Sequence, residues 1–180
     1  MLTSYFWTID RWHKVVESGA LDGEKVELID GKILPMSPEK PFHSYQNRKI
    51  GYALVELLGG LAYVSQSYPI TLDNSEPEPD IAVVRLPEDR YKNSHPTASD
   101  IFWLIEISNT TLRFDLTQKA EIYARNNIPE YWVLDIKNNK LIIHTLPLSG
   151  KYSSIKNLTS KIVTPLAFPQ VKIDVSTWLG

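Results

Sequence analysis

Two apolar runs constrain the fold of this chain most strongly, because each of them carries a carboxylate. The first, residues 77–84, contains Asp80, and the second, residues 101–107, contains Glu106. Consecutive apolar residues of this kind are typical of strands that are covered on both faces of a sheet. A carboxylate in such a strand loses its hydration unless a partner compensates for it. The two acids therefore indicate a polar site within an otherwise apolar sheet, with a metal ion as a candidate partner.

The rest of the pattern predicts an α/β fold with a mixed sheet, flanking helices and an N-terminal β-hairpin. The hairpin joins residues 26–29 to 32–36 through Asp30-Gly31, a strong short-range turn signal. Apolar residues at helical spacing predict helices over 9–17, 43–58 and 115–125. Further strands are predicted over 62–65, 68–72, 131–135 and 140–144, with one or two short strands in the tail from 151 to 180.

Length and composition describe an ordinary globular chain, and we expect a single domain over residues 1–180. The absence of cysteine excludes disulfides and thiolate metal sites. No segment has the roughly 20 apolar residues of a membrane span, so we expect no membrane partner and a cytoplasmic location. The net charge of −2 argues against a high-affinity, nonspecific nucleic-acid binder. It leaves a nuclease open, because bound divalent cations supply positive charge.

The order of Asp80, Glu106 and Lys119 along the chain suggests metal-dependent phosphodiester hydrolysis. Carboxylates bind Mg²⁺ through oxygen, and the bound ion lowers the pKa of its water. A nearby ammonium can stabilise the negative charge that develops on the phosphate. On a helical wheel Lys119 lies at the margin of the apolar stripe, beside Leu116 and Tyr123, so its amine can reach the edge of the sheet.

Pro79-Asp80, Glu106-Ile107-Ser108 and Lys119 together resemble the Pro-Asp…(Asp/Glu)-X-Lys nuclease superfamily. More narrowly, residues 26–31, 77–84 and 104–135 are similar to the Uma-type restriction endonucleases, and the resemblance covers roughly residues 8–145. It implies a restriction-endonuclease-like fold, divalent-metal dependence, a DNA substrate and homodimers. The chain departs from the superfamily pattern at Ser108, where a lysine is usual. The resemblance implies that Lys119, on the following helix, takes over that role.

Four further residues enter the candidate site. The resemblance implies that Glu27 is a third carboxylate of the site and that the backbone carbonyl of Ile107 is a metal ligand. Glu27 has an alternative interpretation as an outward residue of the hairpin. His43 is a candidate for lining the same cleft or a simple surface or cap residue, and Tyr123 is a candidate for lining it or a core residue. Asp115 is predicted to be the N-cap of the Lys119 helix.

Three functions follow from these observations. The first is a DNA endonuclease that uses Mg²⁺, or Mn²⁺ in its place, with Asp80 and Glu106 as ligands and Lys119 and Glu27 as further catalytic residues. The second is a noncatalytic binding or oligomerisation module built on a nuclease fold, which the mild acidity and Ser108 favour. The third is a metal-dependent hydrolase of another phosphorylated substrate.

Overall fold

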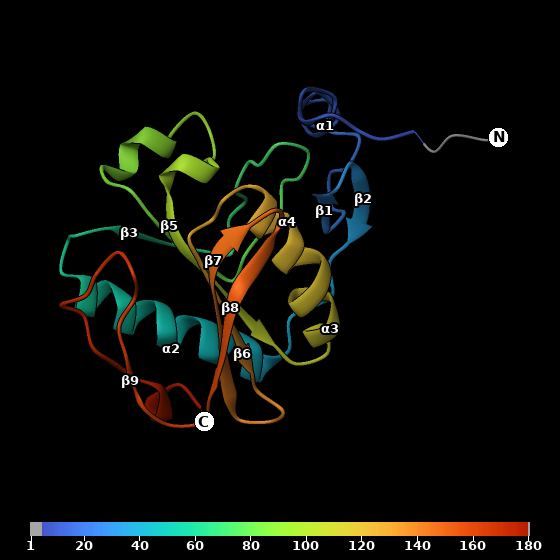
Figure 1. Ribbon diagram of the computed structural model, residues 1–180. Coiled ribbons are helices and arrows are strands. Elements are labelled where there is room, and N and C mark those ends of the chain that lie inside the picture. The colour runs from blue at the N-terminus through green and yellow to red at the C-terminus, as the bar shows by residue number, and fades with distance from the viewer. Residues whose placement is uncertain (1–4, 180) are drawn as a thin grey trace.

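A six-stranded mixed sheet forms the frame of the chain in a computed structural model that describes residues 5–179 (Figure 1). Its strands lie in the order β3-β4-β5-β6-β7-β8, and β5 and β6 pair in parallel while the other neighbours pair antiparallel. The strands are β3 (Tyr63–Gln66), β4 (Ile81–Val84), β5 (Ile101–Ser108), β6 (Glu130–Asp135), β7 (Lys140–Leu148) and β8 (Lys151–Leu158). The predicted mixed α/β class is therefore confirmed.

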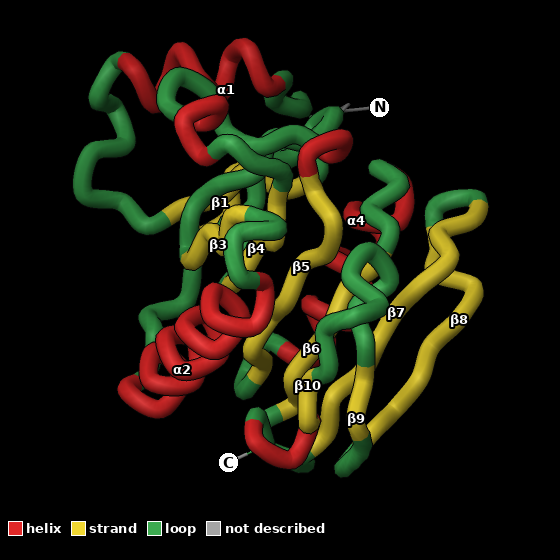
Figure 2. Tube along the Cα trace, turned by 90° about the vertical axis from the view of Figure 1, so that its left-hand side faces the viewer, coloured by secondary structure: helices red, strands yellow, loops and turns green. Residues whose placement is uncertain are grey.

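Helices cover both faces of this sheet, as the two views in Figures 1 and 2 show. The helices are α1 (Ile9–Glu17), α2 (Pro41–Leu58), α3 (Leu112–Phe114) and α4 (Ala120–Arg125). Residues Asp115–Lys119 join α3 to α4 as a π-helical turn. Helix α2 packs on one face of the sheet and α4 packs on the other. Among the described residues, no helix combines the length and the apolar character that crossing a membrane requires.

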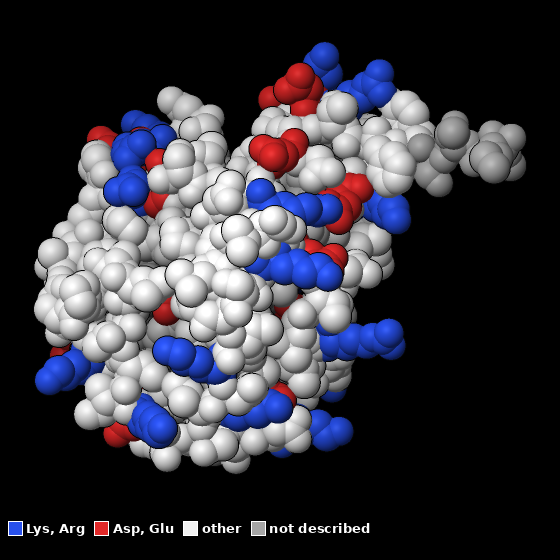
Figure 3. Space-filling view, in the orientation of Figure 1, with Lys and Arg blue, Asp and Glu red and all other residues white. Residues whose placement is uncertain are grey.

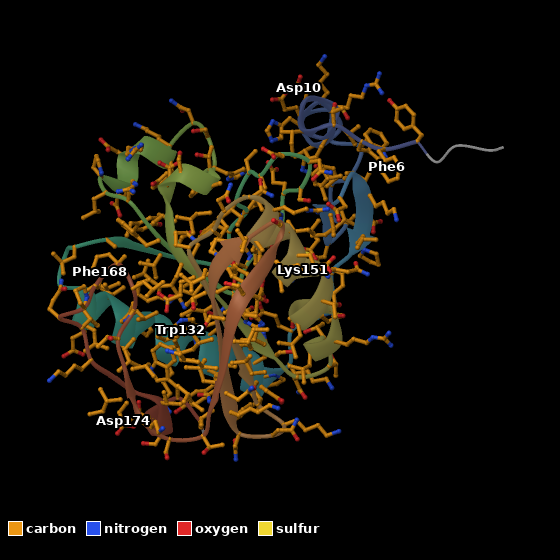
Figure 4. The ribbon with its side chains drawn as sticks, in the orientation of Figure 1. Phe6, Asp10, Trp132, Lys151, Phe168 and Asp174 are labelled. Atoms are coloured by element: carbon orange, nitrogen blue, oxygen red, sulfur yellow. The ribbon has the colours of Figure 1, made fainter. Side chains whose placement is uncertain are left out.

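Alternate residues of the central strands build two apolar layers, as the side-chain period of a strand requires. Ile81, Val83 and Trp103 pack toward α2 and its buried residue Leu54. The neighbouring strand residues pack on the opposite face, where Leu104 meets α4. Figure 4 labels two aromatic members of the α2 layer, Trp132 from β6 and Phe168 from the C-terminal tail. The apolar runs predicted as doubly covered strands are therefore β4 and β5.

The N-terminal hairpin, β1 (Val26–Ile29) and β2 (Lys32–Pro35), forms a small sheet of its own beside α4 (Figure 1). Asp30 and Gly31 both have positive φ angles, 47° and 69°, which the Asp-Gly pair tolerates. A β-bridge between Leu28 and Glu76, together with a hydrogen bond from the Gly31 N–H to the Asn74 carbonyl, connects the hairpin to the segment before β4. The hairpin prediction is confirmed, and the bridge fixes the position of β1 relative to the main sheet.

Four sequence-based expectations are corrected. Residues 68–72 form no strand, because the backbone N–H groups of Ile70 and Leu72 donate to loop carbonyls instead of a neighbouring strand. Helix α2 begins at Pro41 rather than His43, since a proline at the first helical position needs no N–H donor. Asp115 lies inside the helical run, whose N-cap is Thr111. Asp80 directly precedes β4 and lies outside the strand itself.

The tail contains more sheet structure than the sequence indicates. Strand β8 pairs with β7 along most of its length, whereas only short strands were expected after residue 150. The expected short strands are present as β9 (Ile162–Val163) and β10 (Ile173–Asp174), which pair with each other. Polar residues of β8 face solvent, so its apolar pattern is too weak to predict a strand of this length.

His144 on β7 gives the fold a testable pH dependence. It is buried, and its ring lies 5.4 Å from the ring of Tyr131 and 5.6 Å from that of Tyr152. Burial lowers the pKa of His144 below its ordinary value of 6.5. The unfolded chain therefore binds a proton here more readily than the folded chain, so the free energy of unfolding decreases as pH falls below about 6.5.

Replacement of His144 with Phe is expected to reduce this pH dependence, because Phe fills a similar volume without titrating. Thermal denaturation between pH 5 and pH 7.5 measures the effect, with His95→Phe as the control for an exposed histidine. We expect the melting temperature of His144→Phe to fall less on acidification than that of the wild type. Equal falls in the two proteins would show that His144 contributes nothing to acid sensitivity.

Candidate metal-dependent active site

A cavity of about 650 Å³ lies between the start of α2, the hairpin, the end of β5 and the π-helical turn. Seven of its lining residues are acids and three are lysines. The acids are Glu24, Glu27, Glu39, Glu78, Asp80, Glu106 and Asp115, and the lysines are Lys25, Lys40 and Lys119. The excess of carboxylates makes the cavity electronegative, which favours the binding of cations.

Strand register places the two principal acids side by side. In the antiparallel pairing of β4 with β5, Ile81 lies opposite Ile105, so Asp80 lies at the level of Glu106. Asp80 Oδ2 accepts a hydrogen bond of 2.5 Å from the backbone N–H of Ile107. The hydrogen bond holds the Asp80 carboxylate against β5. The side chain is still 13% exposed, and it lines the cavity. Asp80, directly before β4, and Glu106, on β5, thus reach the same cavity.

Glu106 is buried at the inner end of the cavity, with 4% of its surface exposed. Its Oε1 accepts hydrogen bonds from Lys119 Nζ at 2.8 Å and from the Tyr123 hydroxyl at 3.0 Å. Burial raises the pKa of Glu106 to about 8, and the ammonium of Lys119 counteracts that rise. Both of these donors act on the same oxygen, so Oε2 is the oxygen available to a ligand in the cavity.

Lys119 closes the π-helical turn, and its side chain is 8% exposed. A π-helical turn inserts an extra residue into a helix and is frequent at functional sites. Burial acts to lower the pKa of the Lys119 ammonium, but the carboxylates of Glu106, Glu27 and Asp115 outweigh burial and raise it. Lys119 therefore remains charged, and its ammonium points at the sheet edge as the helical wheel predicts.

Glu27 reaches the same cavity from the hairpin strand β1. It is buried, its Oε2 lies 4.0 Å from Lys119 Nζ, and it accepts a hydrogen bond from the backbone N–H of Glu78 at 3.3 Å. Glu27 is thus not the outward-facing hairpin residue of the alternative interpretation. The ammonium of Lys119 lies between carboxylates contributed by β1 and β5.

The predicted site residues gather in this one region. Glu27, Asp80, Glu106, Ile107, Lys119 and His43 line the cavity. His43 Nε2 lies 3.2 Å from Asp80 Oδ2. Tyr123 lies behind the cavity, fully buried in the α4 layer, and contacts the site through its hydrogen bond to Glu106. Tyr123 is therefore a core residue, as one of the two alternatives has it, and its hydroxyl also contacts the site residue Glu106.

Four acids of the cavity were not among the predicted site residues, namely Glu24, Glu39, Glu78 and Asp115. Asp115 is buried and accepts a hydrogen bond of 2.7 Å from the Thr111 hydroxyl. Burial raises the pKa of Asp115. Asp115 lies four residues before Lys119, and this spacing places the two side chains on the same face of a helix. That spacing was the sequence signal that could have added Asp115 to the candidate site. Glu39 precedes α2 and belongs, with His43 and Asp80, to a group whose ligand atoms lie within 4.8 Å of one another.

These residues fit a divalent cation. Asp80 and Glu106 supply carboxylate oxygens at one level of the cavity, and Ile107, the next residue on β5, donates its backbone N–H to Asp80 and also lines the cavity. Oxygen ligands of this kind suit hard divalent cations. The surrounding acids also leave a net negative charge, which a cation would neutralise.

A comparison with solved structures supports the fold. A chain described as "a putative nuclease belonging to DUF820" from Anabaena variabilis aligns with a TM-score of 0.75. The alignment covers 96% of this chain and 99% of that chain, at 16% sequence identity. At that identity the likeness concerns the fold alone. A comparison with curated proteins finds no match.

A family model described as "Putative restriction endonuclease" matches residues 6–176, which is nearly the whole chain. The match includes both apolar strands with their acids, the π-helical turn and the hairpin. The chain therefore belongs to the Uma2 family.

Proposed function

We propose that this protein is a metal-dependent nuclease that hydrolyses phosphodiester bonds of DNA. The observation that carries the proposal is the meeting of Asp80, Glu106 and Lys119 in one acidic cavity. Membership of the Uma2 family supports the nuclease class. Mg²⁺ is the cation that two carboxylates and a backbone carbonyl suit best, and Mn²⁺ is expected to substitute for it.

Each side chain has a distinct role in this proposal. Asp80 and Glu106 hold the cation, with the carbonyl of Ile107 as a further ligand. When bound, a divalent cation lowers the pKa of a water molecule and neutralises charge on the scissile phosphate. Lys119 presents its ammonium to the charge that develops on the phosphate. Glu27 is a second carboxylate near the Lys119 ammonium, at 4.0 Å against 2.8 Å for Glu106, and helps to hold it in place.

The charge distribution explains why a cation is needed. A cavity with seven acids and three lysines repels a phosphate until a cation binds. In Figure 3, blue side chains are scattered among white and red ones and do not form one continuous basic area. The acidic lining of the cavity therefore leads us to expect that DNA affinity depends on the metal ion.

Nicking of supercoiled plasmid tests the function. We expect cleavage with Mg²⁺ or Mn²⁺ and none with EDTA. Parallel reactions with RNA and with free nucleotides separate a DNA nuclease from a hydrolase of another phosphorylated substrate. A protein that cleaves none of these substrates and gains no thermal stability from Mg²⁺ or Mn²⁺ would favour the noncatalytic module. A single domain over 1–180, a homodimer and a cytoplasmic location stay predictions.

Replacement of Tyr123 with Phe is expected to weaken cleavage about 10-fold. The hydroxyl of Tyr123 orients Glu106 Oε1, and its loss frees the carboxylate to rotate away from the cation. Tyr152→Phe is the matched control, since the buried Tyr152 hydroxyl donates to the carbonyl of Ile128 outside the cavity. Each variant loses one buried hydrogen bond, about 1 kcal/mol of stability. Equal cleavage by the two variants would contradict a positioning role for Tyr123.

A further inference from the structure

Glu39, just before α2, and His43, in the first turn of α2, bring a second set of ligand atoms to Asp80. Glu39, His43 and Asp80 each offer one atom, and these three atoms lie within 4.8 Å of one another. His43 Nε2 is 3.2 Å from Asp80 Oδ2. All three residues line the cavity, so a small ion can reach them.

The spacing agrees with ligands that surround one ion. With ligand distances of about 2.1 Å, two ligands at right angles lie about 3.0 Å apart and two opposite ligands about 4.2 Å apart. The separation between His43 and Asp80 is close to the first value. Two carboxylates and a neutral imidazole also carry the charge that balances a divalent cation. Small side-chain adjustments therefore suffice to form a neutral complex.

The surrounding contacts hold these side chains in place. The Ser44 hydroxyl donates to Glu39 Oε2 at 2.5 Å, and the backbone N–H of Ile107 donates to Asp80 Oδ2. His43 is mostly buried, with 17% of its side chain exposed. Its Nδ1 is inaccessible to solvent and has no hydrogen-bond partner among residues 5–179. The imidazole of His43 thus contacts Asp80 inside the cavity through its Nε2 atom.

We propose that Glu39, His43 and Asp80 bind a divalent transition-metal ion, with His43 as a nitrogen ligand. The proposal rests on the proposed function, because Asp80 is shared with the cation position at Glu106. Imidazole nitrogen suits transition metals, whereas Mg²⁺ is bound mainly by oxygen. The second ligand set therefore makes the protein prefer Mn²⁺ to Mg²⁺ at this position.

Pulsed electron paramagnetic resonance of the Mn²⁺-loaded full-length protein tests the proposal, because it detects a nitrogen nucleus bound directly to the ion. We expect nitrogen coupling in the wild type and its loss in His43→Gln. The control is His95→Gln, since His95 is exposed and lies outside the cavity. Isothermal titration is expected to show Mn²⁺ affinity weakened about 10-fold or more in His43→Gln, with a smaller change for Mg²⁺. Glu39→Gln is expected to weaken Mn²⁺ binding in the same direction.

Two spectroscopic results would overturn the proposal. One is Mn²⁺ bound to the wild type without nitrogen coupling, and the other is coupling that persists in His43→Gln. If Mn²⁺ binds without nitrogen coupling and plasmid is still nicked, the nuclease assignment stands and only the His43 site fails. If the wild type binds neither Mn²⁺ nor Mg²⁺, both proposals fail. Because the wild-type spectrum alone decides the first result, a folding defect in a variant leaves the test intact.

Discussion

Replacement of Asp80 with Asn is expected to lower metal-dependent DNA cleavage by about 10³-fold or more. The asparagine oxygen can still accept the hydrogen bond from the backbone N–H of Ile107, so the local fold is retained. The variant removes one negative charge from an acid-rich cavity, and it is therefore expected to be at least as stable as the wild type in EDTA. It loses the rise in melting temperature that Mg²⁺ or Mn²⁺ gives the wild type.

Asp100→Asn is the matched control for this variant. Asp100 directly precedes β5 as Asp80 directly precedes β4, it is buried, and it lies outside the cavity. It pairs with Arg90 and accepts hydrogen bonds from Thr97. We expect Asp100→Asn to lose stability and to keep its cleavage and its metal-induced stabilisation. Normal cleavage by Asp80→Asn would show that the reaction does not use this carboxylate.

Replacement of Lys119 with Met is expected to reduce both cleavage and stability. Loss of the ammonium removes charge stabilisation at the phosphate, about 10²–10³-fold in rate. It also leaves Glu106 buried without its ionic partner, which costs about 3–5 kcal/mol in proteins. Methionine retains the length of the lysine stem, so packing against the α4 layer changes little. Plasmid nicking and denaturant titration measure the two effects separately.

The stability loss in Lys119→Met depends on pH in a defined direction. Burial raises the pKa of Glu106 to about 8 in the intact protein, and Lys119 is the group that counteracts burial. Without Lys119 the pKa of Glu106 rises further. A carboxyl with a raised pKa takes up a proton on folding, so stability falls as pH rises above its ordinary value of 4.5. We expect a larger loss at pH 8 than at pH 5.

The double variant Glu106→Gln/Lys119→Met separates structure from catalysis. Replacing both partners of a buried ion pair leaves no uncompensated charge, and such replacements are often neutral. We therefore expect most of the lost stability to return while cleavage stays at least as low as in Lys119→Met. A double variant as unstable as Lys119→Met alone would show that the pair is not the source of the loss.

The sequence predicts the parts of the site that arise from strong local patterns. Asp-Gly turns specify hairpins, and continuous apolar runs specify doubly covered strands, so the hairpin and β4 and β5 follow from the sequence. The adjacency of Asp80 and Glu106 depends on strand register, which the motif order suggests but the apolar pattern does not fix. Lys119 follows from the helical wheel, because its position beside Leu116 and Tyr123 is a local property.

Other parts depend on contacts between distant segments. The π-helical turn at Asp115–Lys119 has no sequence signature, and the position of Asp115 inside it was predicted as an N-cap. Glu39 is a loop acid whose proximity to Asp80 depends on where α2 docks on the sheet. The segment 68–72 has the residue types of a strand, but its backbone groups bond to loops, a tertiary effect that outweighs propensity.

Anomalous X-ray diffraction from crystals soaked in Mn²⁺ tests the central claim most directly. We predict an ion in the cavity with a carboxylate oxygen of Asp80 and one of Glu106 each at about 2.0–2.6 Å. Such an ion would be lost in crystals of Asp80→Asn. A map in which Asp80 and Glu106 contact no common ion, or in which they point to opposite sides of the sheet, would contradict the account.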